Sequence, residues 1–113
     1  MLDPNAVFVT TTENVPGYRV VSMLGMVFGV ASRSRNSAAT KGSGLMMLKG
    51  GEFDAFTELC AETCYDAVDR MRRAASEKGA NAVVAARFST EDMIDTAGAT
   101  VAYGTAVVLQ KVQ

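Results

Sequence analysis

Three segments that read as β-strands carry apolar or small side chains on both faces, yet the sequence offers only one long helix to cover them. The segments are 20–30, 82–88 and 100–109. Side chains alternate between the two faces of a strand, so a helix packed on one side shields only half of these positions. We therefore expect the other face to meet a second sheet or another copy of the chain.

The long helix is predicted over 52–78, where apolar residues recur at steps of three and four. Gly79 follows as a natural left-handed stop. Such a helix is about 40 Å long, whereas a compact domain of this size has a diameter of about 35 Å. The subunit should therefore be elongated.

Two strands are predicted before the helix, near 7–11 and 18–31, and two after it, near 82–88 and 100–112. Turn residues at 14–17 suggest a hairpin-like reversal between the first pair, and the acidic residues Glu91 and Asp92 suggest a turn between the second pair. The order β-β-α-β-β favours an α+β fold, with an antiparallel sheet and one helix in two layers. The 113 residues fit a single domain, 1–113.

Charge and hydropathy limit the classes of partner that we expect for this chain. Lys plus Arg is 11 against 12 for Asp plus Glu, so a net charge of -1 gives no general attraction to nucleic acid or anionic lipid. The longest uncharged runs, 20–32 and 97–110, are shorter than the roughly 20 residues that span a bilayer. The N-terminal MLDPNAVFV lacks the features of a secretory signal. We expect a cytoplasmic protein with neither a membrane nor nucleic acid as its partner.

The sequence contains few residues that could support catalysis. The chain has no histidine, so the commonest general base is missing. The hydroxyls of Ser22, Thr63 and Thr105 have no neighbour in the sequence that would activate them. We assign no catalytic residue and expect a binding or structural protein. An enzyme, or a protein that binds a small ligand or an anion between subunits, remains the alternative.

Cys60 and Cys64 are the two cysteines, and their spacing places both on one face of the predicted helix. Two thiolates at this spacing could serve a soft metal ion such as zinc or copper(I). Two ligands do not complete a site, and small buried side chains in the apolar stripe are the alternative interpretation.

A basic segment lies between the second strand and the helix. Residues 32–51 carry Arg33, Arg35, Lys41 and Lys49 without an acidic residue, a local charge of +4. These four residues are candidates for binding an anion or a phosphate group. A solvated loop or a loop that contacts another subunit is the explanation that we favour over an anion site.

The sequence resembles the YbjQ-like family, often described as candidate heavy-metal-binding proteins. The stretches that carry the resemblance are YRVVSMLGMVFGVA, the GG before the helix, GANAVVAARF and VAYGTAVVL, which together cover about 7–112. One departure is Ala85, where the family often has glycine. The resemblance implies a two-layer α+β subunit with a dodecin-like core. It also implies a homo-oligomer, a pentamer or a multiple of one, whose strands form a ring around a central barrel. It suggests a soft metal ion as cargo and establishes no activity.

Overall fold

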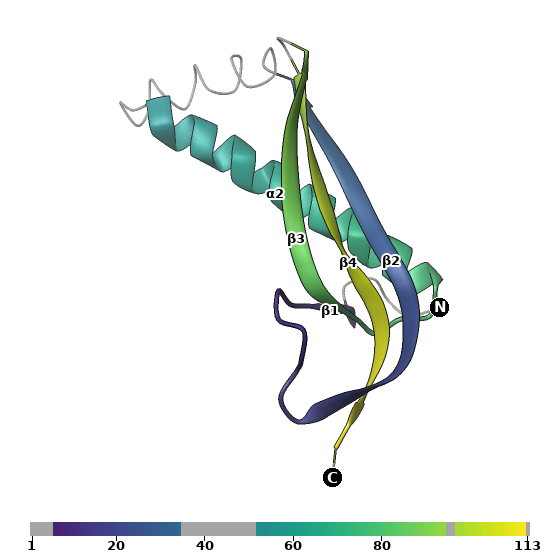
Figure 1. Cartoon of the computed structure of the whole chain (residues 1–113). Helices are drawn as coiled ribbons and strands as arrows, with labels where there is room; N and C mark the ends of the chain where they lie inside the picture. Colours follow the sequence, from purple (N-terminus) through teal and green to yellow (C-terminus); the bar gives the residue numbers. More distant parts are fainter. Residues whose placement is uncertain (1–5, 35–51, 95–96, 113) are drawn as a thin grey trace.

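The computed structural model describes residues 6–34, 52–94 and 97–112, and within them the side chains of 6–32, 60–90 and 98–112. The described elements are β1 (Phe8–Val9), β2 (Tyr18–Ser34), α2 (Glu52–Glu77), β3 (Ala82–Ile94) and β4 (Ala97–Lys111). The four strands form one sheet in the order β1-β3-β4-β2, and α2 crosses one face of it (Figure 1). The expected α+β class is therefore confirmed.

The sheet is mixed, so the prediction of a purely antiparallel sheet is wrong. β4 pairs antiparallel with both β2 and β3, but β1 pairs parallel with β3, with Phe8 opposite Ala82. Because β1 pairs with β3 and not with β2, the predicted hairpin between the first two strands is absent. β4 occupies only one edge of β3, and the other edge accepts β1, whose Phe8 N–H donates to the Asn81 carbonyl at 3.1 Å.

The predicted acidic turn after residue 88 is also wrong. β3 continues to Ile94, with Glu91 opposite Ala99 and Asp92 opposite Gly98 on β4. Pairing along the whole hairpin outweighs the low strand propensity of acidic residues, because strand propensity depends strongly on context.

The helix ends where the sequence predicts. Gly79 has a φ of 86°, its N–H donates to the Ser76 carbonyl at 2.9 Å, and the Ala80 N–H donates to the Ala75 carbonyl at 3.0 Å. This pair of bonds is a Schellman motif, which satisfies the last carbonyls of the helix and turns the chain towards β3.

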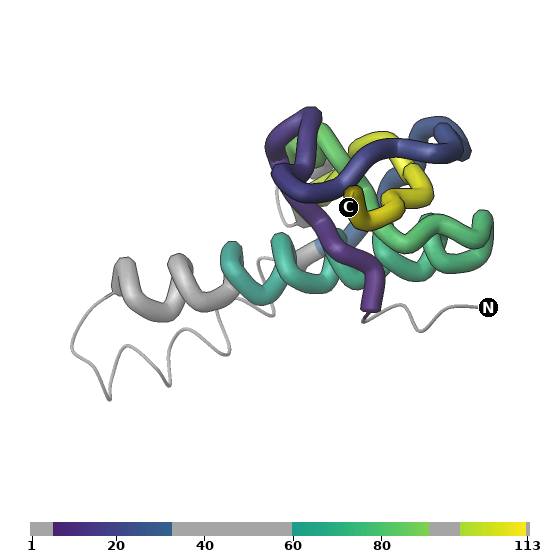
Figure 2. The backbone as a smooth tube through the Cα atoms, turned by 90° about the horizontal axis from the view of Figure 1, so that it is seen from below, coloured from purple at the N-terminus to yellow at the C-terminus, as the bar shows by residue number. Residues whose placement is uncertain are grey.

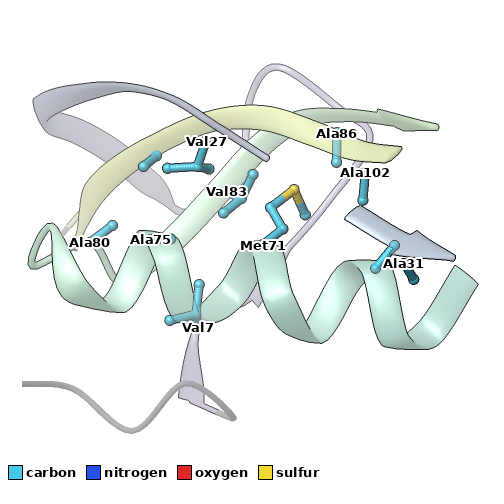
Figure 3. Close-up of a cluster of buried hydrophobic side chains, with 11 residues drawn as sticks. Val7, Val27, Ala31, Met71, Ala75, Ala80, Val83, Ala86 and Ala102 are labelled. Atoms are coloured by element: carbon cyan, nitrogen blue, oxygen red, sulfur yellow. The ribbon is translucent and has the colours of Figure 1, made fainter. Parts of the chain in front are cut away.

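The core between α2 and the sheet is built mainly from small residues around Met71, which is fully buried. In Figure 3 the Met71 side chain rises from α2 towards Val83, Ala86 and Ala102. Small residues allow the helix and the sheet to approach closely, so the two layers together are thin. The radius of gyration is 16.8 Å, with extents of 54 × 27 × 23 Å, against about 13 Å for a compact domain of this length. The subunit is elongated, as expected.

Candidate functional site

The face of the sheet turned away from α2, called the open face below, carries large apolar side chains. Its members are Val20, Met23, Met26, Phe28 and Val30 of β2 and Tyr103 of β4, which are between 38% and 73% exposed. Their strand register places them together, with Phe28 directly opposite Tyr103. The view in Figure 2 shows α2 on one side of the strands only. Contiguous apolar patches of about 300–600 Å² on a protein surface commonly mark interaction sites.

Where β2 and β4 pack against α2, the buried residues are small. Val27 and Ala31 of β2 and Ala102 and Ala106 of β4 are buried there, and Gly29 lies directly against the helix backbone. A monomer gains most by burying its largest apolar side chains. In this chain the described part of β2 places them in solvent.

One end of the open side of the sheet is covered by the chain itself. Val15, from the segment between β1 and β2, packs with Leu109 against a small cluster formed by Ala82, Val84 and Val107. Beside it lies a hollow of about 270 Å³ lined by Phe8, Val15, Tyr18, Asn81 and Leu109. The cluster covers β3 and β4 at this end, whereas Met23 of β2, opposite Val107, stays 73% exposed.

Asn81 fixes the geometry of that covered end. Its Nδ2 donates to the Leu109 carbonyl at 2.9 Å, and its Oδ1 accepts the Leu109 N–H at 2.7 Å. The side chain thus imitates a strand and pairs with the backbone of β4. Our sequence reasoning missed this residue, although an asparagine between a helix stop and an apolar strand is a recognisable signal for a side chain that bonds backbone.

The sheet has two unlike free edges among the described residues. β2 is the outermost strand on one side, and its residues 20–32 contain no charge and no proline. On the other side, β1 pairs only with the start of β3, so β3 from Phe88 onward has a neighbour on one side alone. Proteins usually protect long edge strands with charges, proline or covering elements. Most of β2 lacks these protections.

The predicted thiol pair lies on α2. Cys60 and Cys64 are both half-buried, one helical turn apart. Among the residues that the structure describes, no group of three or more His, Cys, Asp or Glu side chains could hold a metal ion. One chain therefore supplies two thiols but not the three or four ligands that a zinc site requires.

The predicted anion site cannot be placed. Arg33 belongs to β2, but its side chain lies outside the described residues, as do Arg35, Lys41 and Lys49 altogether. The hydroxyl-bearing Ser22, Thr63 and Thr105 stand on β2, α2 and β4. A basic hollow that the sequence did not indicate, of about 300 Å³, is lined by Arg19, Gln110, Lys111 and Val112.

Comparison with known proteins decides the family. A family model described as "Putative heavy-metal-binding" matches residues 7–110. The chain belongs to the YbjQ-like family. It is 44% identical to the UPF0145 protein YjfJ of Lactococcus lactis over 94% of this chain and 97% of that protein. It is 42% identical to a UPF0145 protein of Streptomyces griseus over 94% of this chain and 88% of that protein.

A solved structure shares the fold of this YbjQ-like chain. It is a protein of unknown function from Pediococcus pentosaceus, described as a member of the DUF74 family. The match has a TM-score of 0.58 at 15% identity and covers 92% of this chain and 98% of that one. Within the described residues, no helix of this YbjQ-like protein is long and apolar enough to cross a membrane.

Proposed function

We propose that this YbjQ-like chain is the subunit of a homo-oligomer, a binding or structural assembly in which neighbouring copies cover the open face. The observation that carries the proposal is the distribution of side-chain size on β2. Gly29 and Ala31 face α2, whereas Met26 and Phe28 face solvent. Burial of a side chain as large as phenylalanine or methionine contributes about 1.5–3 kcal/mol, and a second copy offers the surface on which to gain it.

The two free edges favour a ring over a face-to-face dimer. β2 and the outer part of β3 differ in length and sequence, so a contact between them is heterologous, and heterologous contacts close into rings when the rotation permits. In such a ring the open face lines the interior and α2 the exterior. Five subunits, or a multiple of five, around a barrel with a dodecin-like core is the arrangement that the family resemblance implies, and we adopt it for this chain.

Size-exclusion chromatography with light scattering, together with native mass spectrometry of the untreated protein, tests the assembly. We expect one species of five subunits or a multiple. Phe28→Asp should shift it to smaller species, because a charge on the open face would be buried without a partner. The matched control is Tyr65→Asp on α2, since Tyr65 is 72% exposed but lies away from the open face. A wild-type chain that stays monomeric would refute the proposal.

We further propose that the assembly binds a soft metal ion, in keeping with the description of its family, through Cys60 and Cys64. Because one chain offers only two thiols, another copy would have to supply the remaining ligands. Native mass spectrometry after addition of cadmium should show adducts that disappear in Cys60→Ala/Cys64→Ala. Alanine suits a helix interior, so the variant should remain folded. Adducts that persist unchanged in it would contradict the thiol site.

A further inference from the structure

Two thioethers stand side by side on the open face. Met23 and Met26 are 73% and 65% exposed. Met23 lies opposite Val107 and Met26 opposite Thr105, and those two residues of β4 are two apart and therefore share a face. The two methionines consequently occupy neighbouring positions on one face, about 7 Å apart along the strand.

A backbone irregularity creates this pairing. Residues three apart on a regular strand point to opposite faces. In β2 the register shifts between Met23 and Gly25, and Gly25 has a φ of 101°, as expected for a β-bulge. Leu24 then packs against the helix-side core, and Met23 turns to the open face beside Met26.

The surroundings of the two sulfurs suit a soft monovalent cation. Thioethers are neutral, soft donors that prefer ions such as Cu(I). Phe28 lies on the same face as Met26, and Tyr103 stands opposite Phe28, so two aromatic residues lie next to Met26 on the side away from Met23. An aromatic face attracts a nearby cation, by about 0.5–2 kcal/mol depending on desolvation. Hard divalent ions gain little here, because they require oxygen ligands.

We propose that Met23 and Met26 form a thioether site for a soft monovalent ion, Cu(I) or Ag(I), separate from the thiol pair. The thiol pair belongs to α2, which crosses the other face of the sheet. The site rests on the proposed assembly in one respect: neighbouring copies bring further thioethers to the interior and complete the donor set.

Silver(I) is the probe, added to the Cys60→Ala/Cys64→Ala chain so that thiols cannot compete. We expect native mass spectrometry to show silver adducts, and the ε-methyl resonances of Met23 and Met26 to shift among the seven methionines. Adding Met23→Leu and Met26→Leu should abolish the adducts, since leucine keeps the face apolar and nearly the same volume. The control Met71→Leu, at a buried methionine, should keep them.

The same spectra separate this site from the assembly. Subunit number reports the oligomer, and the mass of each species reports silver. Adducts that survive Met23→Leu/Met26→Leu, shifts confined to other methionines, or no silver adduct at all would overturn the thioether site. A monomer that still binds silver through Met23 and Met26 would uphold the site while refuting the oligomer. An intact oligomer that binds no silver would uphold the oligomer and refute the thioether site.

Discussion

Gly29 of β2 packs directly on the α2 backbone at Ala67. A Cβ atom at position 29 would collide with the Ala67 carbonyl oxygen and with the Met71 backbone N. Arg70, on the same stretch of helix, donates from Nη1 to the Val30 carbonyl at 3.0 Å. Strand and helix are thus joined at one point by close packing and by a hydrogen bond. This contact fixes how near α2 lies to the sheet.

Gly29→Ala should therefore destabilise the subunit strongly. The clash is with backbone atoms, which cannot rotate away, so the helix would have to move outward. Overpacking typically costs about 1–3 kcal/mol and occasionally more, and we expect the upper end of that range in the free energy of unfolding measured with urea. Ser32→Ala, at an exposed position of the same strand, is the control and should change it by less than about 0.5 kcal/mol. Equal effects of the two substitutions would contradict the close contact.

Asn81→Ala should also lower the free energy of unfolding. It removes both hydrogen bonds to Leu109 and leaves part-buried backbone groups unsatisfied, which costs about 1–3 kcal/mol. Hydrogen exchange should locate the effect at the end of β4, where the Leu109 amide would lose protection. Asn14→Ala, at an exposed position, is the matched control. An unchanged exchange rate of the Leu109 amide in Asn81→Ala would show that the two hydrogen bonds from Asn81 do not protect this end of β4.

Ala85→Gly should stabilise the chain. Ala85 has a φ of 56°, a left-handed conformation that costs an L-residue about 1–2 kcal/mol and glycine nothing. After the greater flexibility of glycine in the unfolded chain is subtracted, a gain of about 0.5–1 kcal/mol remains. Ala86→Gly next to it should do the opposite, because that residue is buried in the core. A loss of stability in Ala85→Gly would show that the backbone at position 85 accommodates alanine without strain.

The sequence predicted what depends on periodicity and on single strong signals. The span of α2, its stop at Gly79 and the surplus of apolar strand faces follow from residue spacing alone. The departure from the family pattern at Ala85 also coincides with unusual backbone geometry, since the backbone there adopts a left-handed conformation that glycine accepts without strain.

The sequence failed where pairing between distant segments decides the outcome. Whether β1 lies beside β2 or β3 depends on which edge of the finished sheet is free, and no local pattern contains that information. The bulge at Gly25 shifts the register of β2. Simple alternation would put Leu24 on the same face as Met26, whereas in the structure Met23 shares that face. The candidate thioether pair could not be seen from spacing alone for that reason.

Protein concentration should change the thermal midpoint of unfolding, because an assembly that covers the open face is stabilised by mass action. For the wild-type chain we expect the midpoint to rise over a hundredfold range of concentration. Phe28→Asp should give a lower midpoint that no longer depends on concentration. Met71→Ala should also lower the midpoint, since truncating a buried methionine costs about 2–5 kcal/mol, but should keep the dependence. A wild-type midpoint independent of concentration would instead indicate that the exposed side chains of β2 do not mediate association.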